Sequence, residues 1–417
     1  MQRPAIVTIA YNRTGPLKRL LASIEAASYP DGAEPTLIIS IDNSGSDETA
    51  EAAEEFKYTH GEKVIIKREQ RMGLRNHVLA CSSLSEKYGS IIVLEDDLFV
   101  APCFYEYACR ALEQVENDDR IGGVSLYNHL FNVHTRESFC AIDDGYDNWY
   151  FQIASSWGQA YTAAQWKSFM AWYELNRDRD LASLQVPANV SGWSEKSWLK
   201  YYITYLIETG RFFLYPRVSL TTNFGDVGTH ACTSDSDLQV PLQGRARCGF
   251  SALDESEAVY DAFFEPLGYM SGDQPVLGRL PEGTSEGASE GTSERAESAG
   301  GHGTDSGSGL IVDLYGYKPL DALIKEKAGA DRIPVLTSAW LPYSLIRSYG
   351  RQMRPLPANI IHNVEGNELY LYDAAKPAEP PAEVPEALRY LYEYRGISAK
   401  RMLKIIKYRI MEKLGRN

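Results

Sequence analysis

Short apolar runs alternate with segments of helical periodicity over the first hundred residues. The runs Ala5–Ala10, Leu37–Ile41 and Val64–Ile66 are rich in β-branched residues and have the length of strands. Between the first two runs, from residue 17 to residue 24, apolar positions recur three or four residues apart, which predicts a helix. Strands that alternate with helices favour a parallel sheet with right-handed crossovers. The pattern therefore predicts an α/β fold.

The apolar run Ile91–Leu94 leads directly into three carboxylates, Glu95, Asp96 and Asp97. Four apolar residues in a row are typical of a strand that is buried on both faces of a parallel sheet. Charges at the tip of a buried strand are costly unless a partner neutralises them. Ligands of open α/β sheets bind at the carboxyl ends of the strands, so the acids indicate a divalent cation completed by substrate phosphates. A solvated turn is the alternative.

Polar residues also follow two other predicted strands. Arg13 follows the first strand and Asp42 ends the second. Each of them alone is an ordinary loop residue. Because parallel strands bring their carboxyl ends to one edge of the sheet, Arg13, Asp42 and the acids of residues 95–97 together predict one shared ligand site.

Composition narrows the class of protein. The chain has 417 residues, of which 44% are apolar and 24% charged, as in globular proteins of more than one domain. Its net charge of −14 argues against nonspecific binding of nucleic acid. The six cysteines form no CxxC pair, so we expect buried thiols and no zinc site. No signal segment or long apolar run is present, so we expect a cytoplasmic protein without a membrane span.

Four motifs carry a family resemblance: IAYNR (9–13), SIDNSGSDETA (40–50), VLEDDLFVAPCFYEY (93–107) and GGVSLYN (122–128). They resemble the nucleotide-sugar-binding half of a GT-A fold glycosyltransferase. The similarity is greatest to the N-acetylglucosaminyltransferase I type and to related bacterial inverting transferases. The resemblance implies a mixed, mostly parallel sheet flanked by helices.

The resemblance also implies roles for the strand-end residues. Members of this family use a UDP-sugar donor and a manganese ion, for which magnesium can stand in. By position, Arg13 would contact the nucleotide and Asp42 the uracil. Glu95 and Asp96 would face the ribose and the sugar, and Asp97 would bind the metal.

The segment Gly73–Tyr88 predicts a helix between the third run and the acidic strand. Its first turn carries Arg75 and His77, which the resemblance suggests as donor contacts. For His77 alone, a histidine on the surface of a helix is the alternative.

The second half carries the expected catalytic residues. The family places its catalytic base in a Trp-acid-acid-Trp stretch, and the matching stretch here is Trp193–Trp198, in which Glu195 is the only acid. Asp226, in a glycine-rich loop, is the rival for this role. His230 matches a loop histidine that contacts the diphosphate or the metal, and neutral imidazole suits manganese. The aromatic element Trp157-Gly158 indicates either a wall of the site or ordinary core.

The end of the chain changes composition twice. Residues 280–309 combine Gly, Ser and Thr with regularly spaced Glu, which predicts a disordered insertion. Residues 400–417 carry seven Lys or Arg against one Glu, a net charge of +6, along an apolar stripe. Such a helix either docks on the body of the protein or lies on an anionic membrane surface.

These patterns predict six segments. They are a nucleotide-sugar-binding half (1–128), an acceptor-side half with the catalytic base (129–279), the disordered insertion (280–309), a C-terminal extension (310–375), a Pro-rich linker (376–385) and a basic amphipathic helix (386–417).

The function expected from this reading is transfer of a hexose from a nucleotide-sugar, with inversion, to a hydroxyl of a glycan or lipid-linked acceptor. The metal would offset charge on the leaving group, and Glu195 would accept the hydroxyl proton. A sugar-phosphate nucleotidyltransferase is one alternative, but it needs a glycine-rich phosphate loop, which IAYNRTGP lacks. A non-catalytic glycan-binding protein on a transferase fold is the other.

Overall fold

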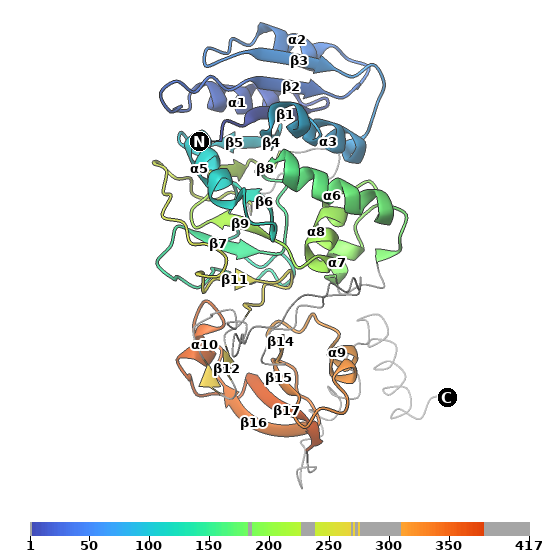
Figure 1. Cartoon of the computed structure of the whole chain (residues 1–417), viewed down its shortest axis with the longest axis vertical. Helices are drawn as coiled ribbons and strands as arrows, with labels where there is room; N and C mark the ends of the chain where they lie inside the picture. Colours follow the sequence, from blue (N-terminus) through green and yellow to red (C-terminus); the bar gives the residue numbers. More distant parts are fainter. Residues whose placement is uncertain are drawn as a thin grey trace, which may run out of the picture. The chain divides into compact units, whose positions relative to one another are not determined.

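The structure is a computed structural model that describes residues 2–181, 186–226, 238–267, 270–271, 274–275 and 310–378 (Figure 1). These residues divide into two compact units. The first unit contains the described residues up to 275 together with residues 352–363, and the second contains residues 310–351 and 364–378. The chain therefore leaves the second unit and returns to it once.

A nine-stranded sheet in the order β11-β7-β9-β6-β8-β4-β1-β2-β3 forms the centre of the first unit. Figure 1 shows these strands following one another from β3 to β11. Strands β1, β2, β3, β4, β6 and β9 run in one direction, and β7, β8 and β11 run against them. The strands are β1 (Ala5–Ala10), β2 (Leu37–Ile41), β3 (Lys63–Lys67), β4 (Ser90–Glu95), β6 (Ile121–Ser125), β7 (Asn148–Phe151), β8 (Gln159–Thr162), β9 (Phe212–Pro216) and β11 (Val259–Tyr260).

The helices of the first unit pack in two groups. Apolar residues of α1, α2 and α5 share one core cluster with the sheet. Helices α3 and α6 both lie against α8, and α4 lies against α6. The bounds are α1 (Thr14–Glu25), α2 (Glu48–Glu55), α3 (Leu74–Ser82), α4 (Ser85–Tyr88), α5 (Phe104–Val115), α6 (Ala163–Asn176), α7 (Ala188–Ser191), α8 (Trp198–Glu208) and α10 (Ala358–Ile361). The expected mixed, mostly parallel α/β architecture is confirmed.

The expected single helix over residues 73–88 is wrong, because it is interrupted between α3 and α4. The Ser83 hydroxyl donates to the carbonyl oxygen of Leu79 at 3.0 Å. The amide of Leu84 bonds three residues back, to Cys81, at 3.1 Å. Serine hydroxyls that bond to the backbone compete with the helical ladder, which accounts for the break.

A short antiparallel ribbon extends from the acid-bearing end of β4. Strand β5 (Leu98–Val100) pairs with β10 (Thr221–Asn223). The ribbon joins the segment after Asp97 to the segment before Asp226.

The second unit has a four-stranded sheet of its own, in the order β14-β15-β17-β16. Its core gathers Val335, Leu341, Tyr372 and neighbouring apolar residues. The elements of the second unit are β14 (Ile311–Asp313), α9 (Leu320–Glu326), β15 (Pro334–Thr337), β16 (Tyr343–Tyr349) and β17 (Leu369–Pro377). A short hairpin of β12 (Met270–Ser271) and β13 (Gln274–Pro275) belongs to the first unit. The predicted insertion at 280–309 and the basic helix at 386–417 lie outside the described residues.

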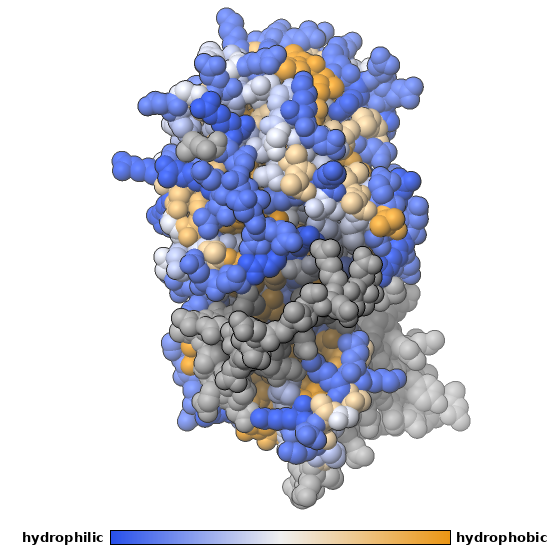
Figure 2. Space-filling model, in the orientation of Figure 1, coloured by the Kyte–Doolittle hydropathy of each residue, from blue (hydrophilic) through white to orange (hydrophobic). Residues whose placement is uncertain are grey.

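Most of the described cysteines are buried as expected, and the face of the molecule in Figure 2 is mainly hydrophilic with small apolar areas. No helix in the described ranges is long and apolar enough to cross a membrane. Cys81, Cys103 and Cys109 are buried free thiols as expected, whereas Cys140 is exposed.

Candidate functional site

The three acids lie at the carboxyl end of β4, where Glu95 is the register partner of Ile9 in β1. Arg13, the residue that precedes α1, reaches across to them. Its Nη2 donates to Asp96 and its Nη1 donates to Asp97 Oδ2 at 3.2 Å. The parallel pairing of β1 with β4 thus brings Arg13 and the acids together, as their positions after two strands suggested.

The acid cluster carries more negative charge than Arg13 balances. Burial raises the pKa of Glu95 to about 8, and repulsion from Asp97 and Asp96 adds to this, although Arg13 opposes it. Burial likewise raises the pKa of Asp96 to about 6, again against the effect of Arg13. A further cation at this position would stabilise the ionised carboxylates.

Asp97 has an oxygen without a partner among the described residues. Its Oδ1 is buried, yet no hydrogen-bond partner contacts it within the described part of the chain. No three acidic, histidine or cysteine side chains in those ranges form a ready-made metal cage. A buried carboxylate oxygen without a partner suits a hard cation that takes its remaining ligands from phosphates and water. His230, the other expected metal ligand, lies outside the described residues.

Asp226 lies beside the same acids. The amide of Phe224 donates to the carbonyl oxygen of Asp97 at 3.1 Å, which holds this segment at the end of β4. The charge of Asp226 adds to the raised pKa of Asp96. Asp226 forms a salt bridge with Arg19 of α1, and the Arg19 guanidinium carbon lies 3.9 Å from the centre of the Phe224 ring.

Sequence reasoning missed Arg19. Its neighbour Lys18 is exposed on the same helix, and nothing in the local sequence separates the two. Arg19 contacts an acid 207 residues away in the chain, so only the fold reveals the pair. The guanidinium groups of Arg13 and Arg19 thus lie among four carboxyl side chains, those of Glu95, Asp96, Asp97 and Asp226.

Asp42 holds the loop before α3. Its Oδ1 accepts the amides of Asn43 at 3.0 Å and Met72 at 2.8 Å, and its Oδ2 accepts the amide of Gly73 at 2.9 Å. Gly73 has φ +75°, a conformation that favours glycine. Asp42 therefore fixes the start of α3, and its contact with a nucleobase stays a prediction.

His77 is not a surface histidine, because only 3% of the residue is exposed. Its Nε2 and the Ser40 hydroxyl of β2 share a hydrogen bond of 2.8 Å. Burial lowers the pKa of His77 to about 4, although the nearby Asp42 acts in the opposite direction. The ring is thus neutral and pins α3 to β2, and its contact with a donor stays a prediction.

Glu195 lies between α7 and α8 in a network of polar groups. It accepts from Lys200 Nζ at 2.6 Å and from the Tyr201 hydroxyl. Arg75 of α3 donates in turn to that hydroxyl at 3.2 Å. The bonds from Lys200 and Tyr201 lower the pKa of Glu195, whose side chain is 71% exposed. Glu195 is therefore an ionised, accessible carboxylate, and Arg75 lies in its network.

The Trp157-Gly158 element supports the ribbon. Gly158 has φ +95°, and a Cβ at this position would lie 2.7 Å from Thr221 Cγ2 of β10. The Thr221 hydroxyl donates to the carbonyl oxygen of Trp157. The Trp157 ring packs on Tyr127 with centres 4.8 Å apart and remains partly exposed. The element thus contributes to the core and holds the ribbon close to it.

One protein family matches the N-terminal part of the chain, which carries the acids. Residues 5–158 match the family model described as Glycosyl transferase family 2. Together with the mixed α/β sheet, this match supports a GT-A glycosyltransferase. The finer resemblance to the N-acetylglucosaminyltransferase I type stays a prediction.

Solved structures give a more distant likeness. A mannosyltransferase, PcManGT from Pyrobaculum calidifontis in complex with GDP-Man and Mn²⁺, is 14% identical with a TM-score of 0.32, over 52% of this chain and 55% of that one. GalNAc-T7 with UDP, GalNAc and Mn²⁺ is 13% identical with a TM-score of 0.35, over 56% and 47%. The chain thus spans about half the length of these proteins. No curated protein matches it.

Proposed function

We propose that this protein is a metal-dependent, inverting glycosyltransferase that moves a sugar from a nucleotide-sugar, most simply a UDP-sugar, to a hydroxyl of a glycan or lipid-linked acceptor. The observation that carries the proposal is the cluster of Glu95, Asp96 and Asp97 at the end of β4, paired with Arg13. This cluster lies within the residues that match the glycosyltransferase family.

Asp97 is the proposed metal ligand. Its buried Oδ1 has no partner among the residues that the structure describes, which fits a hard divalent cation such as Mn²⁺ or Mg²⁺. His230 is proposed as a second ligand from its place in the sequence. A divalent cation at this position offsets the negative charge that develops on a leaving nucleoside diphosphate.

Arg13 is proposed to contact the donor as well as the acids. Its guanidinium offsets part of the charge of Asp96 and Asp97. Because a guanidinium binds phosphate oxygens through two parallel hydrogen bonds, Arg13 would hold the donor diphosphate next to the acids. Asp226, held by Arg19, would stay on the donor side of the site.

Glu195 is the proposed general base. It is ionised and accessible, and Lys200 and Tyr201 hold both of its oxygens in place. It would take the proton from the acceptor hydroxyl as that oxygen attacks the anomeric carbon of the donor. A single in-line attack inverts the configuration at this carbon.

A donor-hydrolysis screen tests the proposal. Purified protein is incubated with UDP-, GDP- and dTDP-sugars, with Mn²⁺ and with a chelator, and the released nucleotide is measured. We expect release from a UDP-sugar that requires the metal. Absence of release from every donor, in protein that is folded, would contradict an active transferase.

A further inference from the structure

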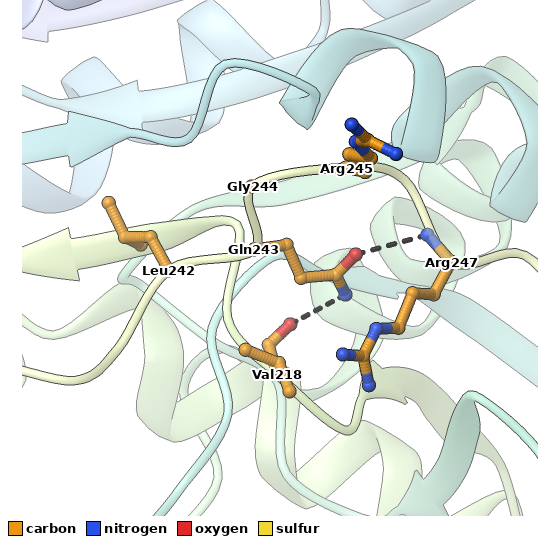
Figure 3. Close-up of a pocket in the computed structure, with 6 residues that line it drawn as sticks. All are labelled: Val218, Leu242, Gln243, Gly244, Arg245 and Arg247. Atoms are coloured by element: carbon orange, nitrogen blue, oxygen red, sulfur yellow. Dashed lines mark hydrogen bonds between the residues drawn. The ribbon is translucent and has the colours of Figure 1, made fainter.

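A cavity of about 400 Å³ lies where the connection from β9 to β10 meets the loop of residues 241–250. Figure 3 shows its lining, which combines apolar, amide and basic groups. The lining residues are Val218, Leu242, Gln243, Gly244, Arg245 and Arg247. A cavity of this volume is in the range that small-molecule ligands occupy.

Gln243 fixes the shape of the cavity. It is buried, and its Nε2 donates to the carbonyl oxygen of Val218 at 2.8 Å while its Oε1 accepts the amide of Arg247 at 3.1 Å (Figure 3). Its own amide donates to the carbonyl oxygen of Ser219 at 2.8 Å. Both ends of the side chain are thus used to hold the loop, so the cavity is preformed.

Two arginines of this loop are available to a ligand. Arg245 and Arg247 are exposed, and over the described ranges neither guanidinium forms an ion pair or a hydrogen bond. Of the neighbouring acids, Glu106 pairs with Arg110 at 3.0 Å, whereas Asp147 accepts the amide of Gly249 at 2.9 Å and keeps its charge. The two arginines outnumber this one carboxylate, so the loop has a local excess of positive charge in a chain with a net charge of −14.

The cavity is separate from the acid cluster. In the β5–β10 ribbon, Thr221 pairs with Val100 and Asn223 pairs with Leu98. Asp97 therefore adjoins one end of the ribbon, whereas Val218 precedes the other end. The acid cluster suits a cation, whereas the arginines of the cavity suit an anion. The two sites would therefore bind different chemical groups.

We infer that this cavity binds the phosphate group of a phosphorylated sugar. Arg245 and Arg247 would donate charge-assisted hydrogen bonds to the phosphate oxygens, a task that suits guanidinium groups. Val218 and Leu242 would contact an apolar face of the sugar ring. The cavity is larger than a free phosphate ion needs, which favours a phosphate carried on a small organic molecule. The choice of a sugar as this molecule rests on the proposed transferase function, whereas the binding of a phosphate does not.

Calorimetric titration of the full chain with a hexose 6-phosphate, the uncharged hexose and inorganic phosphate tests the inference. We expect the hexose phosphate to bind more tightly than inorganic phosphate and the hexose not to bind. Replacing both Arg245 and Arg247 with Gln should weaken the hexose phosphate at least about tenfold, since each charge-assisted bond contributes that order of affinity.

Two control variants test whether the hexose phosphate binds in this cavity. Arg110→Gln removes an equal charge from the nearby α5 and should leave the affinity unchanged, as should Asp97→Asn at the acid cluster. An unchanged affinity in the double variant would overturn the inference, and so would an equal loss in Arg110→Gln or in Asp97→Asn. Inorganic phosphate that binds as tightly as the sugar phosphate would also overturn it. If the double variant does not fold, Arg245→Gln alone carries the test.

Discussion

Arg13 and Arg19 determine the electrostatic state of the candidate site. They contact Asp96, Asp97 and Asp226, and Glu95 adds a fourth carboxylate close by. Two cations among four carboxylates leave an excess of negative charge, which is costly to bury. Burial is the main cause of the raised pKa values of Glu95 and Asp96, and repulsion from the neighbouring carboxylates adds to it. At the residue scale, the site is therefore prepared to accept a further cation.

The first prediction separates the two candidates for the base. Glu195→Gln should lower turnover by about 10²–10⁴ at saturating donor, because a general base contributes that order of rate. Donor affinity should hardly change, since Glu195 lies in the Arg75–Tyr201 network and not in the acid cluster. Asp226→Asn should instead weaken donor or metal binding. Steady-state kinetics of both variants decide between them.

Glu174→Gln is the matched control for this pair, since Glu174 lies on α6, paired with Arg177, away from the acids. If Glu195→Gln retains its turnover and Asp226→Asn loses it at saturating donor, the two roles are reversed.

The second prediction concerns pH. His77 stays neutral in the folded chain down to about pH 4, whereas in the unfolded chain it takes up a proton near pH 6.5. The unfolded state therefore binds more protons between these values, and stability is lost as pH falls through this window. The loss reaches roughly 3 kcal/mol at pH 4. Urea unfolding at several pH values measures it.

His77→Gln should flatten this pH dependence between pH 6.5 and 4. His362→Gln, whose ring is exposed at the end of α10, should leave it as in the wild type. Equal slopes in all three proteins would show that His77 is not protected from protonation by its burial.

At the element scale, apolar runs were sufficient to predict β1, β2 and β4, and with them the edge where Arg13 meets the acids. They did not predict β7 and β8, two interior strands of the sheet in which every residue is buried. Strands buried on both faces lack the alternation of polar and apolar residues, and the polar residues Asn148 and Gln159 shorten the apolar runs of these two strands. The Arg19–Asp226 pair could not be predicted from the sequence, because it depends on packing between segments that are distant in the chain.

A prediction at this scale tests the support of the ribbon. Gly158→Ala places a Cβ against Thr221 at φ +95° and should destabilise the protein by about 1–3 kcal/mol through strain and overpacking. Because β10 leads to Asp226, affinity for donor and metal should fall as well. Gly15→Ala in α1, where no atom lies within 4 Å of the new Cβ, is the control for stability. A Gly158→Ala protein as stable as this control would contradict the account of the ribbon.

At the scale of the whole molecule, the chain does not divide at a single point. Residues 352–363 belong to the first unit although the second unit surrounds them in sequence. Leu356 and Ile360 of this segment are almost fully buried. Residues 352–363 of the expected extension at 310–375 thus group with the first unit, which composition alone could not reveal.

This arrangement gives a fourth prediction. Ile360→Ala should lower the free energy of unfolding by about 2–5 kcal/mol, the usual cost of truncating a buried isoleucine. Ile346→Ala on β16, where the side chain is 38% exposed, should cost well under half of that. Chemical denaturation of both variants measures the difference, and equal small effects would show that residues 352–363 do not stabilise the first unit.

The central claim is that Asp97 holds a divalent cation through which the nucleotide binds. Calorimetric titration of UDP with and without Mn²⁺, into the wild type and into Asp97→Asn, tests it most directly, with Asp178→Asn at an exposed position as the control. The account predicts metal-dependent UDP binding in the wild type and in the control, and its loss in a folded Asp97→Asn protein. Undiminished Mn²⁺-dependent binding of UDP by Asp97→Asn would contradict it.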